Sequence, residues 1–291
     1  MPRTFEDPIT VAGIPFNQGP DADGVEWYCD ELEGWEDTTE PNLETAKFGY
    51  SDGVAVGERA PLDPRFVEFG GAVVATTRAA ADRAFRRLQS ALDPNAYFVA
   101  ERIGPIPERM TMRLAGKVYK PKDIGHAFRF ATTIMAPWPY KLGTLQKQGT
   151  AGVFTSREYV RTYPRVYPLK YVADGVDTGT SIPTSIDLFN EGNANSYPII
   201  RVFGPLAANS WYLVNDATGE QQRFTLAMGT GQTLTIDERR QVATLEGTVV
   251  DYFVRGDWLY LPPGITSTFR LVAPDDSDTA GFEVTAYDTW R

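Results

Sequence analysis

The stretch WYLVNDATGEQQRFTLAMGTGQTLTID, residues 211–237, decides the fold class of this chain. Three short runs in it are rich in aromatic and β-branched residues, and the turn-forming clusters NDATGE and MGTGQ separate them. The same rhythm continues on both sides, with a strand roughly every 8–12 residues, which is typical of an antiparallel β-sandwich or barrel. The predicted strands lie at 198–203, 210–215, 222–228, 232–237, 241–245, 248–254, 258–261, 267–272 and 282–290.

The other half of the chain contains one strong helix signal, TRAAADRAFRRLQSAL at residues 77–92. Apolar residues recur in it every three or four positions, which places them on one face, and Thr76 or Thr77 can cap the first turn. That face consists of Ala81, Phe85, Leu88 and Leu92. Strands are predicted around this helix at 8–16, 65–74, 110–119 and 126–135, the last two as a pair.

These patterns predict a mainly β protein with an α+β N-terminal half. A length of 291 residues suits two domains, at roughly 150 residues for each. We place the N-terminal β domain, with its helix at about 77–92, in residues 1–145. Residues 146–291 then hold a linker and the C-terminal β-sandwich.

Composition excludes several classes of protein. The chain has one cysteine, Cys29, and one histidine, His126, so it can form neither an internal disulfide nor a Cys/His zinc cluster. A net charge of −10 argues against nucleic-acid recognition, because phosphate contacts need clustered Lys and Arg. No run approaches the roughly 18 apolar residues of a membrane span, and we expect neither membrane insertion nor a signal peptide.

No motif for catalysis or for metal binding stands out, so we expect no enzyme, no cofactor and no resident metal. Nucleophilic catalysis would need Cys29 or His126, and the acidic neighbours of Cys29 disfavour its thiolate. The many carboxylates of residues 21–40 single out no glycosidase pair. The acidic runs at 21–23 and 275–278 lack the spacing of a calcium-binding loop and are interpreted as turns.

Charge is segregated along the chain. Residues 1–77 hold 16 acidic and 4 basic side chains, residues 78–170 hold 6 and 17, and residues 171–291 hold 16 and 7. The window from Asp21 to Glu40 contains nine acidic residues and no basic one. Solvated acidic loops explain this layout as well as opposite surfaces on one subunit do. In the second case identical subunits can pack head to tail, and this contact closes into a ring if the rotation permits.

Five stretches in the C-terminal third follow one another in a specific order and spacing. They are NANSYPIIRVFGPL (193–206), WYLVNDATGE (211–220), GQTLTIDERRQV (231–242), RGDWLYLPPGITSTFRL (255–271) and VTAYDTWR (284–291). Through them the chain resembles the distal tail proteins (Dit-like minor tail proteins) of siphophages, the bacteriophages with long, non-contractile tails. The N-terminal half fits this family more loosely, through its strand–helix order.

The resemblance implies a structural virion protein without catalytic residues. In the family, the N-terminal β domain assembles into a homo-hexameric ring, and the C-terminal β-sandwich resembles galectins or carbohydrate-binding modules. The ring joins the tail tube to the host-recognition tip, which implies a place at the tail tip of a virion assembled in the host cytoplasm. Implied partners are other copies of the chain, the tail tube protein and the tail tip or baseplate hub protein. The tape-measure protein and a host surface glycan are further candidate partners.

Two alternatives stay open beside this structural role: a carbohydrate-binding adhesin for host attachment, and an enzyme such as a tail-associated hydrolase. For the ring, we expect an acidic stretch of one subunit to face the basic helix face of the next. The residues concerned are Asp30, Glu31, Glu33, Glu36 and Asp37 on one side, and Arg83, Arg86 and Arg87 on the other. For an adhesin, the candidate sugar contacts are Trp211, Tyr212, Trp258 and Tyr260, although strand alternation predicts that some of these rings pack in the core.

Overall fold

The structure is a computed structural model that describes residues 7–41, 45–47, 54–56, 62–120, 123–154, 183–250, 254–273 and 280–291. The acidic run at 275–278 lies outside the described residues. The chain divides into two compact units. Unit 1 comprises Met1–Thr144 with Trp290–Arg291, and unit 2 comprises Leu145–Thr289.

Both units are mainly β, which confirms the predicted fold class. The elements of unit 1 are β1 (Ile9–Val11), β2 (Ile14–Phe16), β3 (Glu26–Glu33), β4 (Thr45–Lys47), β5 (Val54–Val56), β6 (Arg65–Val74), α1 (Arg78–Ala91), β7 (Phe98–Arg102), β8 (Glu108–Leu114), β9 (Asp123–Ile124), β10 (Ala127–Ala136) and the start of β11 (Lys141–Phe154). Among the described residues, no helix has the length and apolar character needed to cross a membrane.

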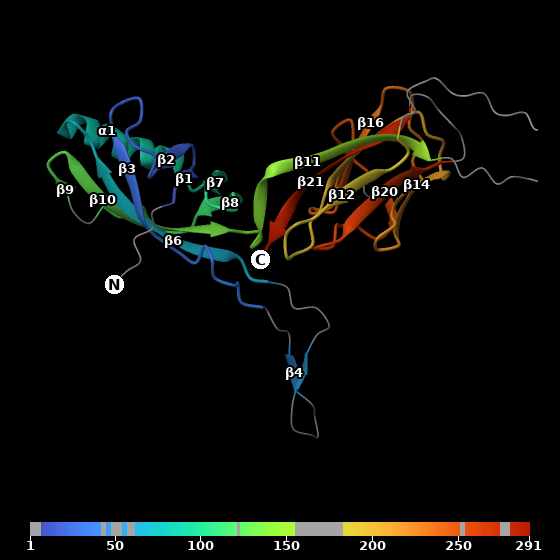
Figure 1. Ribbon diagram of the computed structural model, residues 1–291, viewed down its shortest axis with the longest axis horizontal. Coiled ribbons are helices and arrows are strands. Elements are labelled where there is room, and N and C mark those ends of the chain that lie inside the picture. The colour runs from blue at the N-terminus through green and yellow to red at the C-terminus, as the bar shows by residue number, and fades with distance from the viewer. Residues whose placement is uncertain are drawn as a thin grey trace, which may run out of the picture. The chain divides into compact units, whose positions relative to one another are not determined.

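Two series of strands enclose the core of unit 1. In the first, β6 pairs antiparallel with β3 on one side and with β10 on the other (Figure 1). In the second, β2, β1, β7 and β8 follow one another, and β8 also pairs with the start of β11. The two series meet where Arg113 and Leu114 of β8 lie opposite Met135 and Ile134 of β10.

The predicted pairing of strands 110–119 and 126–135 is confirmed in part. After the β8–β10 contact, the N–H groups of Ala115 and Gly116 donate to the carbonyl oxygen of Thr133, and Tyr119 forms a bridge with Ala131. Residues 110–112 pair with β7 instead. β8 ends at Leu114, while β10 pairs over its full length with β6. β6 occupies the other edge of β10, and both strands bury the same face: Val67 lies opposite Ile134, and Val73 lies opposite Phe128. The hydrophobic pattern thus sets the register.

Helix α1 closes one end of this core, as its sequence pattern predicts. Thr77 is its N-cap, and the side chain accepts a hydrogen bond of 3.1 Å from the backbone N–H of Ala80. The buried residues of the helix are Ala80, Ala81, Ala84 and Leu88. Phe85 packs edge-on against Phe128 of β10, with the ring centres 5.4 Å apart.

The acidic segment after residue 25 forms β3, a strand that the sequence analysis did not predict. Trp27 and Cys29 of this strand point into the core, and the ring of Phe16 packs edge-on against Trp27 at 5.6 Å. Opposite them, a Cβ at Gly71 would lie 1.9 Å from the carbonyl oxygen of Tyr28. Only glycine therefore permits this close approach of β3 and β6.

Unit 2 is a sandwich of two sheets around a second core. One sheet contains β13 (Ile199–Phe203), β16 (Thr233–Asp237), β17 (Val242–Leu245), β18 (Thr248–Val249) and β21 (Gly281–Trp290). The other contains β12 (Ile186–Phe189), β14 (Trp211–Asn215), β15 (Glu220–Phe224), β19 (Val254–Gly256) and β20 (Thr266–Val272). The end of β11 runs parallel to β20.

The strand predicted at 258–261 is not formed. Only Leu261 makes an isolated bridge, with Ser196, while Leu259 and Leu261 are buried. The two prolines that follow, Pro262 and Pro263, lack the N–H groups that a continuing strand would need. The segment therefore alternates like a strand because it covers the core, without joining a sheet.

Candidate functional site

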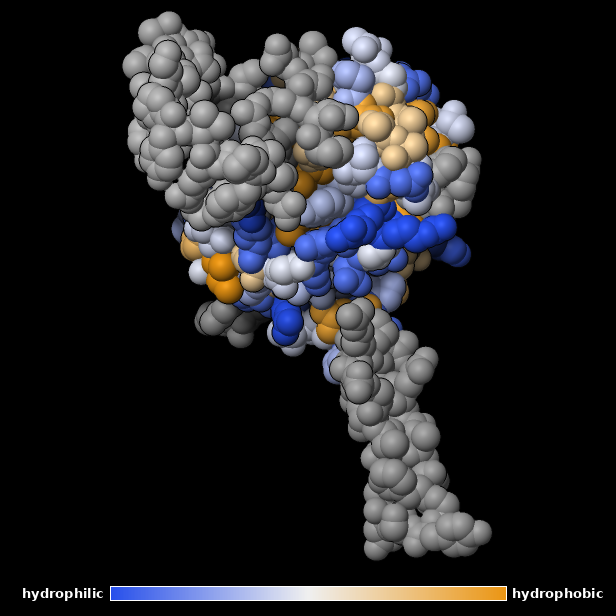
Figure 2. All heavy atoms as spheres, turned by 90° about the vertical axis from the view of Figure 1, so that its right-hand side faces the viewer, coloured by the Kyte–Doolittle hydropathy of each residue, from blue (hydrophilic) through white to orange (hydrophobic). Residues whose placement is uncertain are grey.

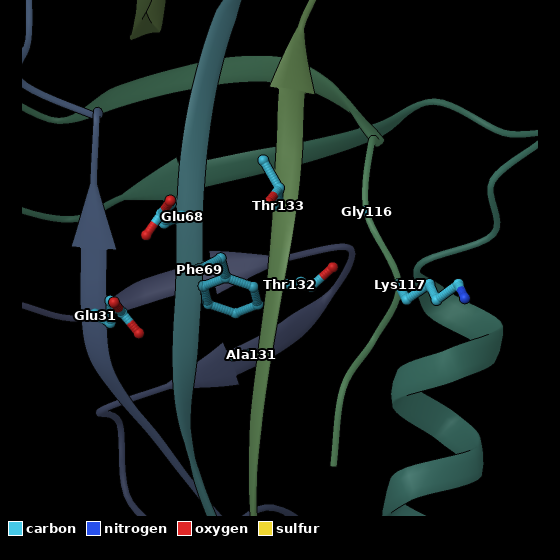
Figure 3. A pocket seen from close by; sticks show the side chains of 8 residues that line it. All are labelled: Glu31, Glu68, Phe69, Gly116, Lys117, Ala131, Thr132 and Thr133. Carbon is cyan, nitrogen blue, oxygen red and sulfur yellow. The ribbon is translucent and has the colours of Figure 1, made fainter. Parts of the chain in front are cut away.

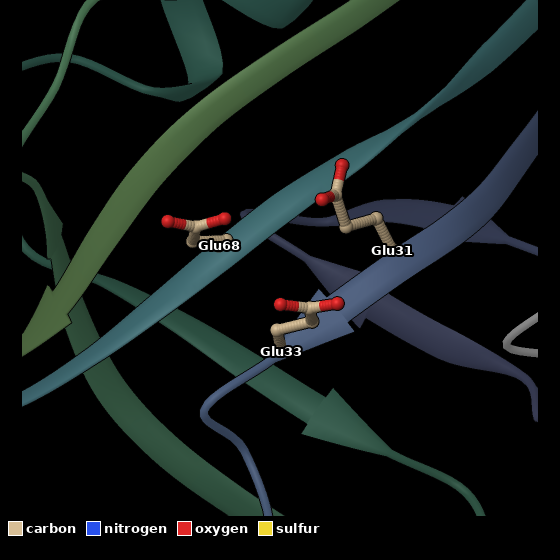
Figure 4. Close-up of side chains that lie close together, drawn as sticks. All are labelled: Glu31, Glu33 and Glu68. Carbon is tan, nitrogen blue, oxygen red and sulfur yellow. The ribbon is translucent and has the colours of Figure 1, made fainter. Parts of the chain in front are cut away.

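Three glutamates form an acidic cluster on the solvent face of β3 and β6. Glu31 and Glu33 lie on β3, and Glu68 lies opposite Glu33 on β6. All three side chains are exposed, and carboxylate oxygens of the three lie within 4.8 Å of one another (Figure 4). Like charges at this distance repel by about 1 kcal/mol per pair even in bulk water. The cluster therefore favours a cationic neighbour.

A hollow of about 290 Å³ borders this acidic cluster (Figure 3). Its lining residues are Glu31, Glu68, Phe69, Gly116, Lys117, Ala131, Thr132 and Thr133. The hydroxyl of Thr132 is buried and has no hydrogen-bond partner among the described residues. However, Thr132 shares the core-facing side of the sheet with Phe69, and Figure 3 shows its oxygen pointing away from the glutamates. Exposed carboxylates alone give no ground for assigning a metal.

The acidic first block and the basic middle block of the sequence meet inside unit 1. Five ion pairs among the described residues join an acid of residues 1–77 to a base of residues 78–170. They are Asp7–Arg102 and Asp21–Arg87, at 2.8 and 2.7 Å, Asp30–Arg129, Glu36–Arg102, and Glu36–Lys141 at 2.8 Å. Part of the charge segregation therefore serves pairing within one chain.

Arg65, at the start of β6, is 2% exposed and fixes the loop that follows β3. Its guanidinium donates hydrogen bonds to the carbonyl oxygens of Gly34 at 3.1 Å, Trp35 at 3.0 Å and Asp37. Its Nε donates to the carbonyl oxygen of Pro139 at 2.9 Å. Asp37 thus takes part through its backbone, while its side chain is exposed.

A buried ion pair continues this network. Glu108 accepts a hydrogen bond from the indole N–H of Trp35 at 3.2 Å, and its other oxygen lies 3.2 Å from Nζ of Lys141. Lys141 also reaches Glu36. Burial by itself would raise the pKa of Glu36, but the bonds and charges of Lys141 and Arg102 outweigh it and lower that pKa.

The basic face of α1 carries Arg83, Arg86 and Arg87, all exposed. Arg87 is engaged within the chain, because it pairs with Asp21 and its guanidinium lies 5.8 Å from the ring centre of Trp27. Burial would raise the pKa of Asp21, but hydrogen bonds, chiefly from Trp27, together with the charge of Arg87 lower it. Neither Arg83 nor Arg86 forms an ion pair within the part of the chain that the structure describes.

The acidic residues predicted to face another subunit fall into two groups. Asp30 and Glu36 pair with bases of their own chain, whereas the side chains of Glu31, Glu33 and Asp37 form no ion pair in the described ranges. Glu68 was not predicted as a site residue, because its place in the cluster results from the register of β3 and β6. A strand signal at Trp27 and Cys29 was available in the sequence, but the register was not.

Trp211 is a core residue, which corrects its assignment as a sugar contact. It is 2% exposed and stacks on Phe224, with the ring centres 4.2 Å apart. Its indole N–H donates a hydrogen bond of 3.0 Å to the carbonyl oxygen of Leu226. The ring therefore offers no face to a ligand at the surface.

The other three candidate sugar contacts are half-buried. Trp258 packs against the core of unit 2, the ring of Tyr212 lies 5.0 Å from the guanidinium of Arg223, and the ring of Tyr260 lies 6.1 Å from that of Tyr197. The face seen in Figure 2 is mostly hydrophilic, with hydrophobic side chains in small, separate patches. The three rings are therefore accessible in part.

Comparison with known protein families finds a match within unit 2. Residues 191–286 match the family model described as siphovirus-type tail component, C-terminal domain. The resemblance to siphophage distal tail proteins is confirmed. The matched family is a structural component of phage tails. A comparison with curated protein sequences finds no match.

Solved structures share the fold over nearly the whole chain. The Dit (gp 19.1) protein of phage SPP1, described as a paradigm of the hub adsorption apparatus in phages that infect Gram-positive bacteria, matches with a TM-score of 0.61 and 12% identity, over 98% of this chain and 99% of that one. A chain of the phage P2 baseplate, activated with Ca, matches with a TM-score of 0.51 and 10% identity, over 96% of this chain and 97% of that one. The corresponding baseplate structure with Sr gives 0.50 and 10%, over 96% of both chains. At these identities, the likeness shows the fold.

Proposed function

We propose that this protein is a distal tail protein, a structural adaptor that forms a hexameric ring between the tail tube and the host-recognition tip of a siphophage. The observation that carries the proposal is the tail-component match of residues 191–286 in a chain whose fold follows a hub protein from end to end. In this role it needs no catalytic residue, cofactor, nucleic-acid recognition or membrane insertion. Its place is the tail tip of the virion, after assembly in the host cytoplasm.

The partners we propose follow from this position. They are other copies of the chain, the tail tube protein and the tail tip or baseplate hub protein, with the tape-measure protein and a host surface glycan as further candidates. The β4–β5 hairpin of unit 1 supports assembly, because its two strands pair with no other described strand. A two-stranded hairpin is at best marginally stable alone, so contact with another chain would complete it.

We propose a sharper version of the charged contact between neighbouring copies. Glu31 and Glu33 are exposed and repel each other, and Arg83 and Arg86 are exposed and without ion pairs among the described residues. These side chains are free to meet across an interface, whereas Asp30, Glu36 and Arg87 serve the fold of their own chain and Asp37 contributes through its backbone. Exposed ion pairs are worth about 0–1 kcal/mol each, so they would set the register of the ring rather than hold it together.

A charge-swap experiment tests this contact. Arg83→Glu with Arg86→Glu should lower the ring fraction measured by light scattering after size exclusion, most strongly at low salt. Adding Glu31→Arg and Glu33→Arg to the same chain should restore the ring, since the ion pairs then re-form with reversed polarity. The matched control is Arg223→Glu with Arg255→Glu, the same charge change at two exposed arginines of unit 2. An unchanged ring in the Arg83/Arg86 variant, or loss without rescue, would overturn the contact.

A carbohydrate-binding role for unit 2 is the second candidate function. The observation in its favour is the pair of half-buried rings Tyr197 and Tyr260, and the partly buried Trp258 precedes Tyr260 by two residues in the chain. Glycan-array binding by the full chain should then be saturable and lost on Trp258→Ala. Tyr212→Ala, on β14, is the comparison variant. Absence of glycan binding by the intact protein would leave the structural role alone.

A further inference from the structure

A carboxyl group is buried between the sheets of unit 2. Glu238 directly follows β16, and its side chain is 0% exposed. Gln222 of β15, whose side chain is also fully buried, lies beside it. An ionised carboxylate in such a place needs a cation or a full set of hydrogen-bond donors.

The hydrogen bonds of Glu238 satisfy only one of its two oxygens. Oε2 accepts from the backbone N–H of Leu259 at 2.9 Å and from Nε2 of Gln222 at 3.4 Å. Oε1 of Glu238 and Oε1 of Gln222 are both buried, and neither has a partner among the described residues. Both orphaned atoms are acceptors, and they belong to two side chains that already touch.

The charges around Glu238 do not compensate a negative charge. Asp237 at the end of β16 and Glu220 at the start of β15 are both acidic, and both disfavour ionisation of Glu238. No ion pair involves Glu238 in the part of the chain that the structure describes. Burial is the largest influence, and with these acids it raises the pKa of Glu238 to about 8 despite the bonds from Leu259 and Gln222.

None of the basic residues on the neighbouring elements forms an ion pair with Glu238 in the described ranges. Arg223 and Arg255 lie opposite each other on β15 and β19, on the exposed side of that sheet, and Gln222 alternates with Arg223. Arg240 lies 3.7 Å from Asp237 at the surface, and Arg239 follows Glu238 in the chain, half-buried. The negative charges nearest to Glu238 therefore dominate its surroundings.

We propose that Glu238 is a neutral carboxylic acid in the folded protein and that its proton makes unit 2 a pH-sensitive structure. The O–H of Glu238 donates to Oε1 of Gln222 while the amide of Gln222 donates to Oε2 of Glu238. This two-point pair satisfies both orphaned oxygens. When the group ionises, the O–H bond breaks, the proton goes to solvent, and an unpaired carboxylate is left between the sheets.

The proton changes how stability depends on pH. In the unfolded chain a glutamate gives up its proton near its ordinary pKa of about 4.3, whereas folded Glu238 keeps it up to about pH 8. Between these values the folded state binds one proton more than the unfolded state, so stability falls as the pH rises. Below this pH window, burial of Glu238 causes no loss of stability. Above the window, the loss of stability no longer increases with pH.

The pH dependence of local opening in unit 2 can be measured in the intact chain. Hydrogen–deuterium exchange of β16 peptides, corrected for the intrinsic pH dependence of exchange, gives an opening constant at each pH. Relative to Glu238→Gln, the wild-type constant should rise about tenfold per pH unit between pH 5 and 8, the slope of one bound proton. Glutamine fits this test because its amide can donate to Gln222 and accept from Leu259 without titrating. Glu246→Gln, at an exposed position, is the matched control and should follow the wild type.

A second measurement detects the proton of Glu238 directly in the native protein, even if Glu238→Gln folds poorly. The infrared spectrum of the native protein at pH 7 should contain the C=O band of a protonated carboxyl group. The band should be absent from Glu238→Gln and present in Glu246→Gln. Equal pH slopes for the wild type and Glu238→Gln, or no protonated-carboxyl band at pH 7, would overturn the proposal.

Discussion

The two units stabilise their buried polar groups by different chemistry. In unit 1 the buried polar side chains are mainly charged, with Arg65, Glu108 and Lys141 linked in one network. In unit 2 they are mainly amides and hydroxyls that bind backbone groups. Asn190, for example, donates to the carbonyl oxygens of Ala194 at 2.7 Å and Leu261 at 3.1 Å.

This difference predicts opposite responses to pH. The pKa values of Asp21 and Glu36 in unit 1 are lowered, so these acids stabilise the fold above their ordinary pKa and lose that contribution as the pH falls. The pKa of Glu238 in unit 2 is raised, so its unit loses stability as the pH rises. One chain thus combines a unit weakened by acid with a unit weakened by base.

Among the variants that test this difference between the units, the replacement of Arg65 should lower the free energy of unfolding the most. Arg65→Met removes the donor of four carbonyl oxygens, those of Trp35 and Pro139 in buried hydrogen bonds, and should cost about 3–5 kcal/mol in the free energy of unfolding. Urea unfolding followed by circular dichroism measures it. Arg129→Met removes an exposed ion pair and should cost less than about 1 kcal/mol. Equal costs for the two variants would contradict a charged core in unit 1.

Truncation of the Trp211–Phe224 stack in unit 2 should have the next largest effect on the free energy of unfolding. Trp211→Ala empties a fully buried site and should cost about 3–5 kcal/mol, whereas the half-buried Trp258→Ala should cost distinctly less. Thermal unfolding of both variants gives the order. A Trp211 variant as stable as the wild type would place this ring outside the core.

Acid should open unit 1 through its ion pairs. Asp21→Asn should cost about 1–3 kcal/mol at pH 7, because the side chain accepts hydrogen bonds from Trp27 and Arg87 as a charged group. The difference from the wild type should begin to shrink as the pH falls below about 4, where the carboxyl of the unfolded chain takes up a proton, and should shrink further until the native carboxylate, whose pKa is lowered, is protonated as well. Hydrogen exchange of β6 peptides between pH 7 and 3 measures this, and a difference independent of pH would rule out the charge as its source.

The smallest effect should come from the acidic cluster. Glu33→Gln removes one member of three mutually repelling carboxylates and should stabilise the free chain by up to about 1 kcal/mol, more at low salt than at high salt. Glu40→Gln is exposed and outside the cluster, so it should change stability by less than about 0.5 kcal/mol. Urea titrations at two salt concentrations compare them. Destabilisation by Glu33→Gln at low salt would show that a cation already occupies the cluster.

The local part of the fold was predictable from sequence. The cap at Thr77, the apolar face from Ala81 to Leu92 and most of the strands after residue 198 depend on neighbours in the chain, and the structure has them. β3 was missed because its acids masked the alternation of Trp27 and Cys29. β11 was missed because its run of Gly, Thr and Gln has no clear period.

The candidate site was predictable only in part, because it depends on contacts distant in sequence. Charge blocks indicated that acids meet bases, yet they could not show that Arg87 pairs with Asp21 of the same chain. Arg65 and Glu238 look like surface residues in a sequence, and only the folded chain shows that both are buried. Register likewise brings Glu68 to Glu33.

The solution mass of the full chain tests the central claim, a ring-forming structural adaptor, most directly. Light scattering after size exclusion should give about six times the subunit mass of 32.3 kDa, with a smaller ring fraction as salt screens the contact between Glu31, Glu33 and the arginines of α1. A ring whose fraction does not change with salt would keep the adaptor and remove the charged contact. A monomer at every salt and protein concentration tested would contradict the ring.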